Sequence, residues 1–245
     1  MARGIAGGGY VLHTRPWKES SLLLELFTPD QGRIGAIMRA ARRVGGRHAV
    51  RPQPFQFYSW TLGGRGELKN LSGLELAGRG RQMGMRPLVT GLYFNELLVR
   101  ALSREAPTPG LFDAYDLSLS ALAELGEVDL HALARRFELA LIDELGVSPP
   151  WDVTVTGEPV DPEGRYRVDP EAGVLPATGL EGTLTGGDLL TLARGQPEHA
   201  GDRRAVRLLL ARLLAPHIGP GPLRSRELWP GNSGPSGSAS PLNVK

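Results

Sequence analysis

Hydrophobic and polar residues alternate along the first third of the chain, which is typical of β-strands with one buried face. We expect five strands, at residues 10–14, 21–27, 33–39, 55–62 and 67–76. In the second of them, Leu22, Leu24 and Leu26 share one face. Because glycines stand where a small barrel must bend, the pattern favours a closed five-stranded antiparallel β-barrel of the OB type over a sandwich.

A helical period replaces the alternation after Pro87, a residue type that is favoured in the first turn of a helix. The spacing of apolar residues predicts three amphipathic helices, at 87–104, at 111–125, and from the N-cap Asp129 to the stop at Gly146. Their short connections favour a bundle.

Pro149 and Pro150 mark a boundary, and a turn-rich stretch follows, with one hairpin around 161–164. Helical periodicity returns at 188–194 and 202–217, and we expect the latter helix to pack on the bundle. Its polar face carries Arg203, Arg204, Arg207 and Arg212. We interpret these arginines as a solvated face, with DNA contact as the alternative.

The fold class expected from these patterns is α+β and multidomain. We assign 1–80 to the OB barrel, 81–150 to the helical bundle, 151–185 to a small β-rich insert, 186–230 to C-terminal helices on the bundle, and 231–245 to a tail. The tail is Gly, Ser and Pro with little apolar content, so we expect disorder; its composition also fits a cloning remnant.

Charge is distributed unevenly, although the formal net charge is only +2. Residues 1–80 carry 12 Lys and Arg against 5 Asp and Glu, residues 81–150 carry 6 against 10, and the rest carries 10 against 11. Such segregation indicates an anion-binding module attached to a part that binds a different partner.

A basic loop between the third and fourth expected strands is the main candidate site. Cations beside aromatic strands suit a surface that holds phosphates and stacks on exposed bases. We expect nucleic-acid binding from Lys18, Arg33, Arg39, Arg42, Arg43, Arg47 and Arg51, with Arg15 and Arg65 as weaker candidates. The candidates for base stacking are Phe55, Phe57, Tyr58 and Trp60. Because some of these rings must fill the barrel, only one or two are free, and alternation does not say which.

Several classes of protein are disfavoured by what the sequence lacks. No apolar run approaches the roughly 18 residues that span a bilayer, and residues 1–9 lack the apolar core of a signal peptide. We therefore expect a cytoplasmic protein, and the expected DNA binding would associate it with the nucleoid. With zero cysteines there is no disulfide and no thiolate ligand for zinc. No phosphate-binding Gly-x-x-x-x-Gly-Lys loop is present and the five histidines are scattered, so we expect no enzyme.

The order of several short motifs resembles the RecO family of bacterial recombination mediators. The motifs are Lys18-Glu19-Ser20-Ser21, Phe27-Thr28, Gly32 to Ile34, Ala40 to Arg43, Gln53-Pro54-Phe55, His217-Ile218-Gly219 and Leu223 to Arg226. None of them is specific alone, but their order and spacing cover nearly all of residues 10–229.

The resemblance implies an OB-fold domain, a helical bundle and a zinc-binding module inserted near the C-terminus. It also implies binding of single- and double-stranded DNA, annealing of complementary strands, contact with the single-strand-binding protein, and assembly with RecR to load the RecA recombinase. This sequence departs from the pattern between Trp151 and Gly179, where many relatives have four cysteines and this chain has none. We therefore expect no structural zinc and no other cofactor.

The resemblance further implies that the helical domain receives the tail of the single-strand-binding protein, which needs an apolar groove with a basic rim. The rim candidates are Arg100, Arg104, Arg135 and Arg136.

Two alternative functions remain open. In the first, the protein is an interaction scaffold whose barrel docks a partner protein, and DNA affinity is incidental. In the second, Mg²⁺ held by carboxylates of the turn-rich insert cleaves phosphodiesters. The carboxylates available for that site are Asp161, Glu163, Asp169 and Glu171.

Overall fold

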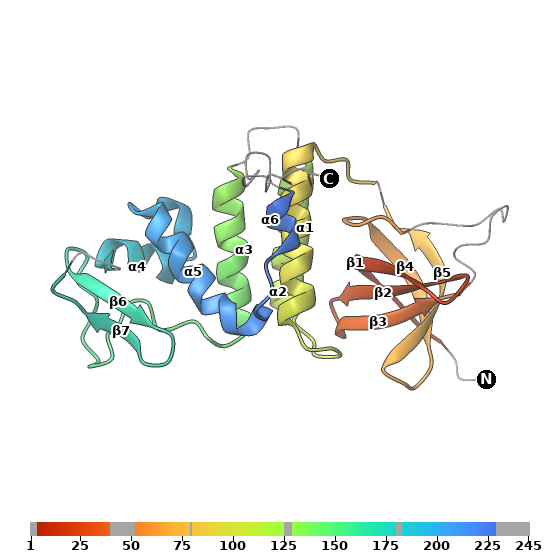
Figure 1. Ribbon diagram of the computed structural model, residues 1–245, viewed down its shortest axis with the longest axis horizontal. Helices are drawn as coiled ribbons and strands as arrows, with labels where there is room; N and C mark the ends of the chain where they lie inside the picture. Colours follow the sequence, from red (N-terminus) through yellow and green to blue (C-terminus); the bar gives the residue numbers. More distant parts are fainter. Residues whose placement is uncertain (1–3, 40–51, 79, 125–128, 180–182, 229–245) are drawn as a thin grey trace, which may run out of the picture.

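The computed structural model describes residues 4–39, 52–78, 80–124, 129–179 and 183–228. A β-barrel, a set of upright helices and a small sheet with its own helices follow one another along the longest axis of the molecule (Figure 1). The tail predicted at 231–245 lies outside the described residues.

The barrel is built from β1 (Ile5–Trp17), β2 (Ser21–Thr28), β3 (Gly32–Met38), β4 (Phe57–Gly63) and β5 (Leu68–Leu76). It closes in the order β1-β2-β3-β5-β4, with β3 and β5 parallel and the other pairs antiparallel. The predicted five-stranded OB-type barrel is therefore confirmed. β1 is longer than predicted because Gly7, Gly8 and Gly9 pair with β4.

Alternation along the strands decides what fills the barrel. Leu24 and Leu26 on β2, together with Ile34 and Ala36 on β3, are fully buried in a core of their own. Two residues on β1 and β2, Tyr10 and Phe27, are equally buried but belong to the core of the helices. One face of the barrel wall therefore packs directly on the bundle.

The bundle consists of α1 (Met85–Ala101), α2 (Pro109–Ala123) and α3 (Leu130–Glu144). The predicted N-cap is observed at Asp129, whose carboxylate accepts hydrogen bonds from the backbone N–H groups of His131 and Ala132. These bonds satisfy donors that a helix leaves free at its first turn, which is why α3 begins there.

The rest of the chain forms a small sheet and further helices. The sheet contains β6 (Arg165–Asp169), β7 (Gly173–Pro176) and β8 (Leu184–Thr185), in the order β7-β6-β8. After it come α4 (Gly186–Ala193), the 3₁₀ turn η1 (Pro197–His199), α5 (Arg203–Ile218) and α6 (Arg224–Glu227). Buried side chains of the sheet and of α5 belong to the same core as the bundle.

The C-terminal strap, residues 221–228, is fastened to α1 by two side chains. Arg100 donates to the carbonyls of Gly221 and Pro222 at 2.7 Å each. The Glu96 carboxylate accepts from the backbone N–H groups of Arg224 and Ser225, at 3.0 and 2.9 Å, and from the Ser225 hydroxyl at 2.7 Å. Burial alone would raise the pKa of Glu96, but the Ser225 and Arg224 hydrogen bonds lower it on balance.

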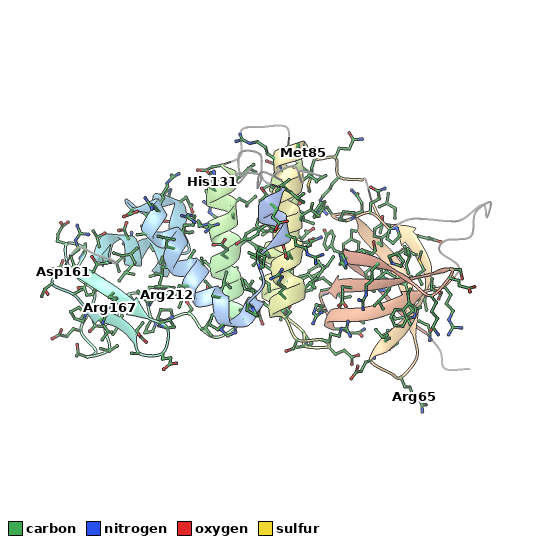
Figure 2. The ribbon with its side chains drawn as sticks, in the orientation of Figure 1. Arg65, Met85, His131, Asp161, Arg167 and Arg212 are labelled. Carbon is green, nitrogen blue, oxygen red and sulfur yellow. The ribbon has the colours of Figure 1, made fainter. Side chains whose placement is uncertain are left out.

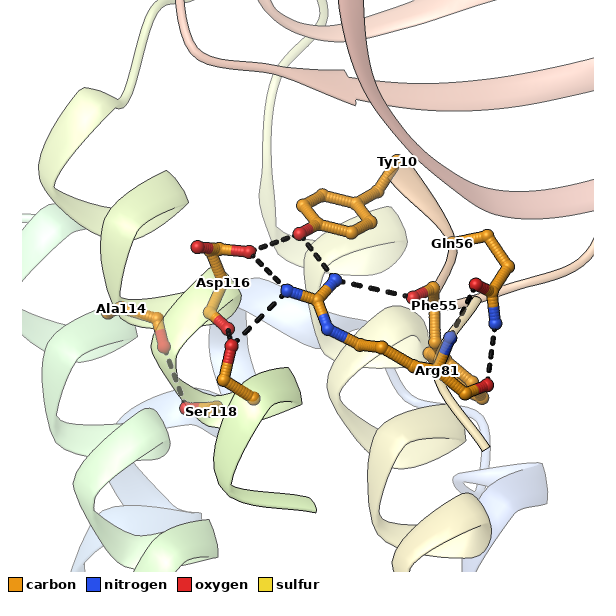
Figure 3. A network of polar contacts seen from close by, with 8 residues as sticks. Tyr10, Phe55, Gln56, Arg81, Ala114, Asp116 and Ser118 are labelled. Atoms are coloured by element: carbon orange, nitrogen blue, oxygen red, sulfur yellow. Dashed lines mark hydrogen bonds and ion pairs between the residues drawn. The ribbon is translucent and has the colours of Figure 1, made fainter. Parts of the chain in front are cut away.

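A polar network joins the barrel to the bundle (Figure 3). Arg81, between β5 and α1, donates to Asp116 on α2 at 2.8 Å and to the Tyr10 hydroxyl at 2.6 Å. The Tyr10 hydroxyl in turn donates to Asp116. Burial, together with the hydrogen bond to Asp116, raises the pKa of Tyr10 to about 12.

Candidate nucleic-acid interface

The strand registers bring two of the predicted cations to one end of the barrel. Trp17 pairs with Ser21 across the β1–β2 turn, and Leu22 pairs with Met38 at the end of β3. The turn that carries Lys18 therefore lies beside Arg39, which follows Met38. We call this part of the barrel the basic end; it comprises Arg15, Lys18 and Arg39.

All three residues of the basic end are exposed, and none forms an ion pair with another described residue. Exposed cations without internal partners remain available to phosphates. The predicted Arg42, Arg43, Arg47 and Arg51 lie outside the described residues. In the sequence they follow Arg39 and precede β4.

Arg33, which we expected to bind nucleic acid, lies at the opposite end of β3 from Arg39 and is engaged within the protein. Its guanidinium pairs with Glu25 at 2.9 Å and donates to the Leu102 carbonyl at 3.0 Å, and its side chain is only 15 % exposed. Arg104 pairs with the same Glu25. Arg33 therefore joins the barrel to the bundle and, unlike Arg39, is not free to meet DNA.

The predicted stacking residues are mostly core residues. Phe55, Tyr58 and Trp60 are 4, 3 and 3 % exposed, because barrel closure and the bundle cover them. Phe55 also precedes β4 instead of lying on it, in a turn with a φ of 66°. Phe57 is half-buried and packs edge-on against Tyr10 with ring centroids 5.3 Å apart. Base stacking thus stays a prediction for Phe57 alone.

Arg65 lies in the β4–β5 turn, away from the bundle core (Figure 2). It lines a shallow pocket of about 390 Å³ with Lys69, Arg104 and two carboxylates. Lys69 is paired with Glu105 at 2.7 Å and Arg104 is paired with Glu25, so two of the three cations that line this pocket already have carboxylate partners. It is a weaker anion site than the basic end.

The four predicted rim arginines do not gather around one groove. Arg100 holds the C-terminal strap, and Arg104 pairs with Glu25 at the junction with the barrel. Arg135 and Arg136 both lie on α3, where they pair with Glu138 and Glu198 respectively. The hydrogen bond from Arg136 lowers the pKa of Glu198 despite partial burial.

Arg135 lines a pocket of about 320 Å³ between α3, η1 and α5, which we call the α3–α5 pocket. Its lining residues are His131, Ala132, Arg135, Pro197, Glu198, Arg203, Arg204 and Arg207. Sequence reasoning assigned the α5 arginines to a solvated face, because the periodicity of α5 does not reveal that α3 lies beside it. Arg212 was assigned there too, but it donates to the Val168 carbonyl on β6.

Two carboxylates of the insert accept hydrogen bonds from backbone N–H groups in its turns. Asp161 accepts from the backbone N–H of Glu163 at 3.1 Å, and Asp169 accepts from Glu171 and Ala172 at 2.9 and 3.0 Å. The described part of the chain contains no group of three or more His, Asp or Glu residues that could hold a metal ion. The magnesium site required by the nuclease alternative is therefore absent from the described residues.

No helix among the described residues is long and apolar enough to cross a membrane.

The architecture is thus that of a protein in which a closed OB-type barrel with a cationic end is fused to a helical domain with a basic pocket. Residues 4–79 match the family described as "Recombination protein O N terminal", and residues 87–227 match "Recombination protein O C terminal". The chain belongs to the RecO family.

Curated relatives agree with this assignment. A protein named "DNA repair protein RecO" from Stutzerimonas stutzeri (strain A1501) is 42 % identical over 221 residues, which cover 90 % of this chain and 91 % of the relative. Proteins of the same name from Pseudomonas paraeruginosa (strain PA7) and Pseudomonas putida (strain W619) are each 40 % identical over 230 residues, covering 94 % of this chain and 96 and 99 % of the relatives. Family membership gives the chain a role in DNA repair and recombination, as a mediator and not as an enzyme.

Proposed function

We propose that the chain binds single- and double-stranded DNA at the basic end of its barrel and anneals complementary strands. The observation that carries the proposal is that Arg15, Lys18 and Arg39 are exposed and unpaired among the described residues, at the end where four further arginines follow in sequence. The mechanism is electrostatic. Cations that neutralise the phosphates of two strands lower their mutual repulsion, so that complementary bases can meet.

A phosphate grip of this kind does not read bases, which is consistent with the burial of three of the four candidate aromatic rings. Phosphate contacts position a nucleic acid, whereas sequence is read through base edges. Binding should therefore show little sequence preference and a steep dependence on salt. Bound to DNA in this way, the protein would be associated with the nucleoid.

The test is a double charge reversal, Lys18→Glu with Arg39→Glu, measured by anisotropy of a labelled oligo(dT) between low and moderate salt. We expect affinity to fall about tenfold or more and the salt slope to decrease by about 1.4, since each phosphate contact on single strands contributes about 0.7. The matched control is Arg165→Glu with Arg167→Glu, which reverses two exposed arginines on β6, far from the barrel.

The same variants separate this function from an interaction scaffold. If the barrel mainly docks a protein, the Lys18 and Arg39 reversals leave oligo(dT) binding and annealing unchanged but abolish capture of RecR. If oligo(dT) affinity falls no further than in the control pair, DNA binding at the basic end is wrong.

We infer that the α3–α5 pocket receives the acidic C-terminal tail of the single-strand-binding protein. Ala132, Pro197 and the aliphatic stems of the arginines supply apolar surface, and Arg203, Arg204 and Arg207 form an exposed basic rim. With the tail in this pocket and DNA on the barrel, assembly with RecR would place the complex where RecA is loaded onto the strand.

A peptide of aspartates that ends in an apolar residue with a free carboxylate is a suitable probe. The double variant Arg204→Glu with Arg207→Glu should reduce its affinity about tenfold or more, because charge pairs at a binding rim turn from attractive to repulsive. An unchanged affinity would place the tail elsewhere on the molecule.

A further inference from the structure

Arg135 differs from the other arginines of the α3–α5 pocket in how deeply it is set. Its side chain is 15 % exposed, whereas that of Arg203 is 62 % exposed and that of its neighbour Arg136 is 56 % exposed. Its Nη2 lies 2.6 Å from Oε1 of Glu138, one turn further along α3. Its Nη1 is buried and has no hydrogen-bond partner in the described structure.

Glu138 is a carboxylate in the interior of the bundle. It is 1 % exposed, and the same Oε1 accepts a hydrogen bond from the hydroxyl of Tyr93 on α1. Tyr93 is itself buried, and its ring lies in the core that α1 and α3 share. A chain of polar contacts thus runs from α1 through Glu138 to the arginine in the pocket wall.

Stability alone is a poor explanation for this arrangement. Taking a carboxylate and a guanidinium out of water is unfavourable, and apolar side chains of similar volume are often as stabilising as a buried ion pair. The arrangement does, however, remove rotational freedom from a long side chain. A donor that is already oriented loses less entropy when a ligand binds.

We propose that Tyr93 and Glu138 are positioning residues of the α3–α5 pocket: they hold the Arg135 guanidinium in the pocket wall, where it is a preset donor for an anionic ligand. This inference rests on the proposed function of the α3–α5 pocket. It extends that function to two residues, Tyr93 and Glu138, that do not line the pocket. The ligand class is a carboxylate, because the arginines that line the pocket pair with carboxylates through charge-assisted hydrogen bonds.

The substitution Glu138→Gln separates positioning from simple electrostatics, because the two accounts predict opposite signs. Removing the negative charge of Glu138 makes the pocket more positive, so attraction by net charge alone would tighten binding of an acidic peptide. If Glu138 instead orients Arg135, replacing the charge-assisted contact by a weaker neutral one loosens the guanidinium and weakens binding. We expect the affinity for the aspartate peptide to fall about tenfold, which is the scale of one charge-assisted hydrogen bond.

The matched control is Glu144→Gln, which removes the same charge from an exposed position on the same helix. It should leave the affinity for the peptide unchanged. A second variant, Tyr93→Phe, keeps the buried ring and removes only the hydroxyl, and it should weaken peptide binding by about two- to fivefold. Oligo(dT) affinity should be unchanged in all three variants, which shows that a loss of peptide binding is not a loss of the fold.

These measurements test the positioning role of Tyr93 and Glu138 separately from the assignment of the pocket. Unchanged or tighter peptide binding in both Glu138→Gln and Tyr93→Phe overturns the positioning role while the pocket assignment stands. Failure of the unmodified protein to bind the peptide overturns the pocket assignment itself. If Glu138→Gln also loses oligo(dT) binding, Tyr93→Phe decides the question, and equal peptide affinity in that variant would contradict the proposal.

Discussion

At the scale of single residues, Tyr10 shows how one side chain can join two parts of the molecule. Its ring packs on Phe112 and Tyr115 of α2 and on Phe57 of β4, while its hydroxyl contacts Asp116 and Arg81. Burial would lower the pKa of Arg81, but the hydrogen bonds to Tyr10 and Asp116 raise it on balance, so the guanidinium remains charged. The contact between the barrel and the bundle therefore contains a charged group, the Arg81 guanidinium, among packed aromatic rings.

Alkaline pH should weaken this junction. Because the pKa of Tyr10 is about 12 in the folded protein against 10.0 for a free tyrosine, its contribution to stability is fully present below pH 10 and is lost as the pH rises through 10 toward 12. We expect the free energy of unfolding to fall over that range more steeply in the unmodified protein than in Tyr10→Phe. Denaturant unfolding at pH 8, 10 and 11 measures the difference, and parallel curves would contradict it. At pH 8 the variant should be less stable by about 1 kcal/mol, the value of a typical hydrogen bond.

At the scale of elements, the β2–β3 hairpin meets the segment between α1 and α2. The backbone N–H of Glu105 donates to the Arg33 carbonyl at 2.8 Å, and Glu25 accepts from both Arg33 and Arg104. Gly32 makes this approach possible. A Cβ at that position would lie 1.9 Å from the Ala106 carbonyl oxygen, and the φ of Gly32 is +66°.

Replacing Gly32 with alanine should therefore separate the hairpin from the bundle. We expect a loss of about 2 kcal/mol or more in the free energy of unfolding, from the left-handed backbone and the clash together. The matched control is Gly110→Ala in the first turn of α2, where a Cβ would meet nothing within 4 Å. Alanine there should be neutral or stabilising, since it favours helix more than glycine does. Equal stability of the two variants in urea would refute the argument.

Many of the strands and helices could be predicted from local sequence patterns. The features that could not be predicted depend on contacts between residues far apart in the sequence. Alternation identifies the strands and their hairpin order, and the Asp129 cap marks the start of α3, because these signals lie within a few residues of one another. The pairing of Arg104 with Glu25, 79 residues away, has no local signature. The burial of Trp60 and the meeting of Arg135 with Arg203 likewise depend on how the barrel closes and how helices pack.

At the scale of the whole molecule, the basic end and the α3–α5 pocket lie on opposite sides of α1, with the barrel beyond one side and α3 with α5 beyond the other (Figure 1). The Tyr10 network and the Glu25 cluster connect the barrel to the bundle, and the bundle shares its core with α5. The two sites are thus separate in space but carried on a continuously packed structure.

Two ligands on such a molecule should bind together without competing. We expect the affinity for the aspartate peptide to be the same, within about twofold, in the absence of DNA and at saturating oligo(dT), because no described residue lines both sites and charges farther apart than the Debye length of about 8 Å are largely screened. The Lys18 and Arg39 reversals should change oligo(dT) affinity only, and the Arg204 and Arg207 reversals peptide affinity only. Anisotropy with two differently labelled ligands measures both affinities in one sample. Displacement of the peptide by oligo(dT) would mean that DNA also occupies the α3–α5 pocket, and the arginines of α5 would then be DNA contacts.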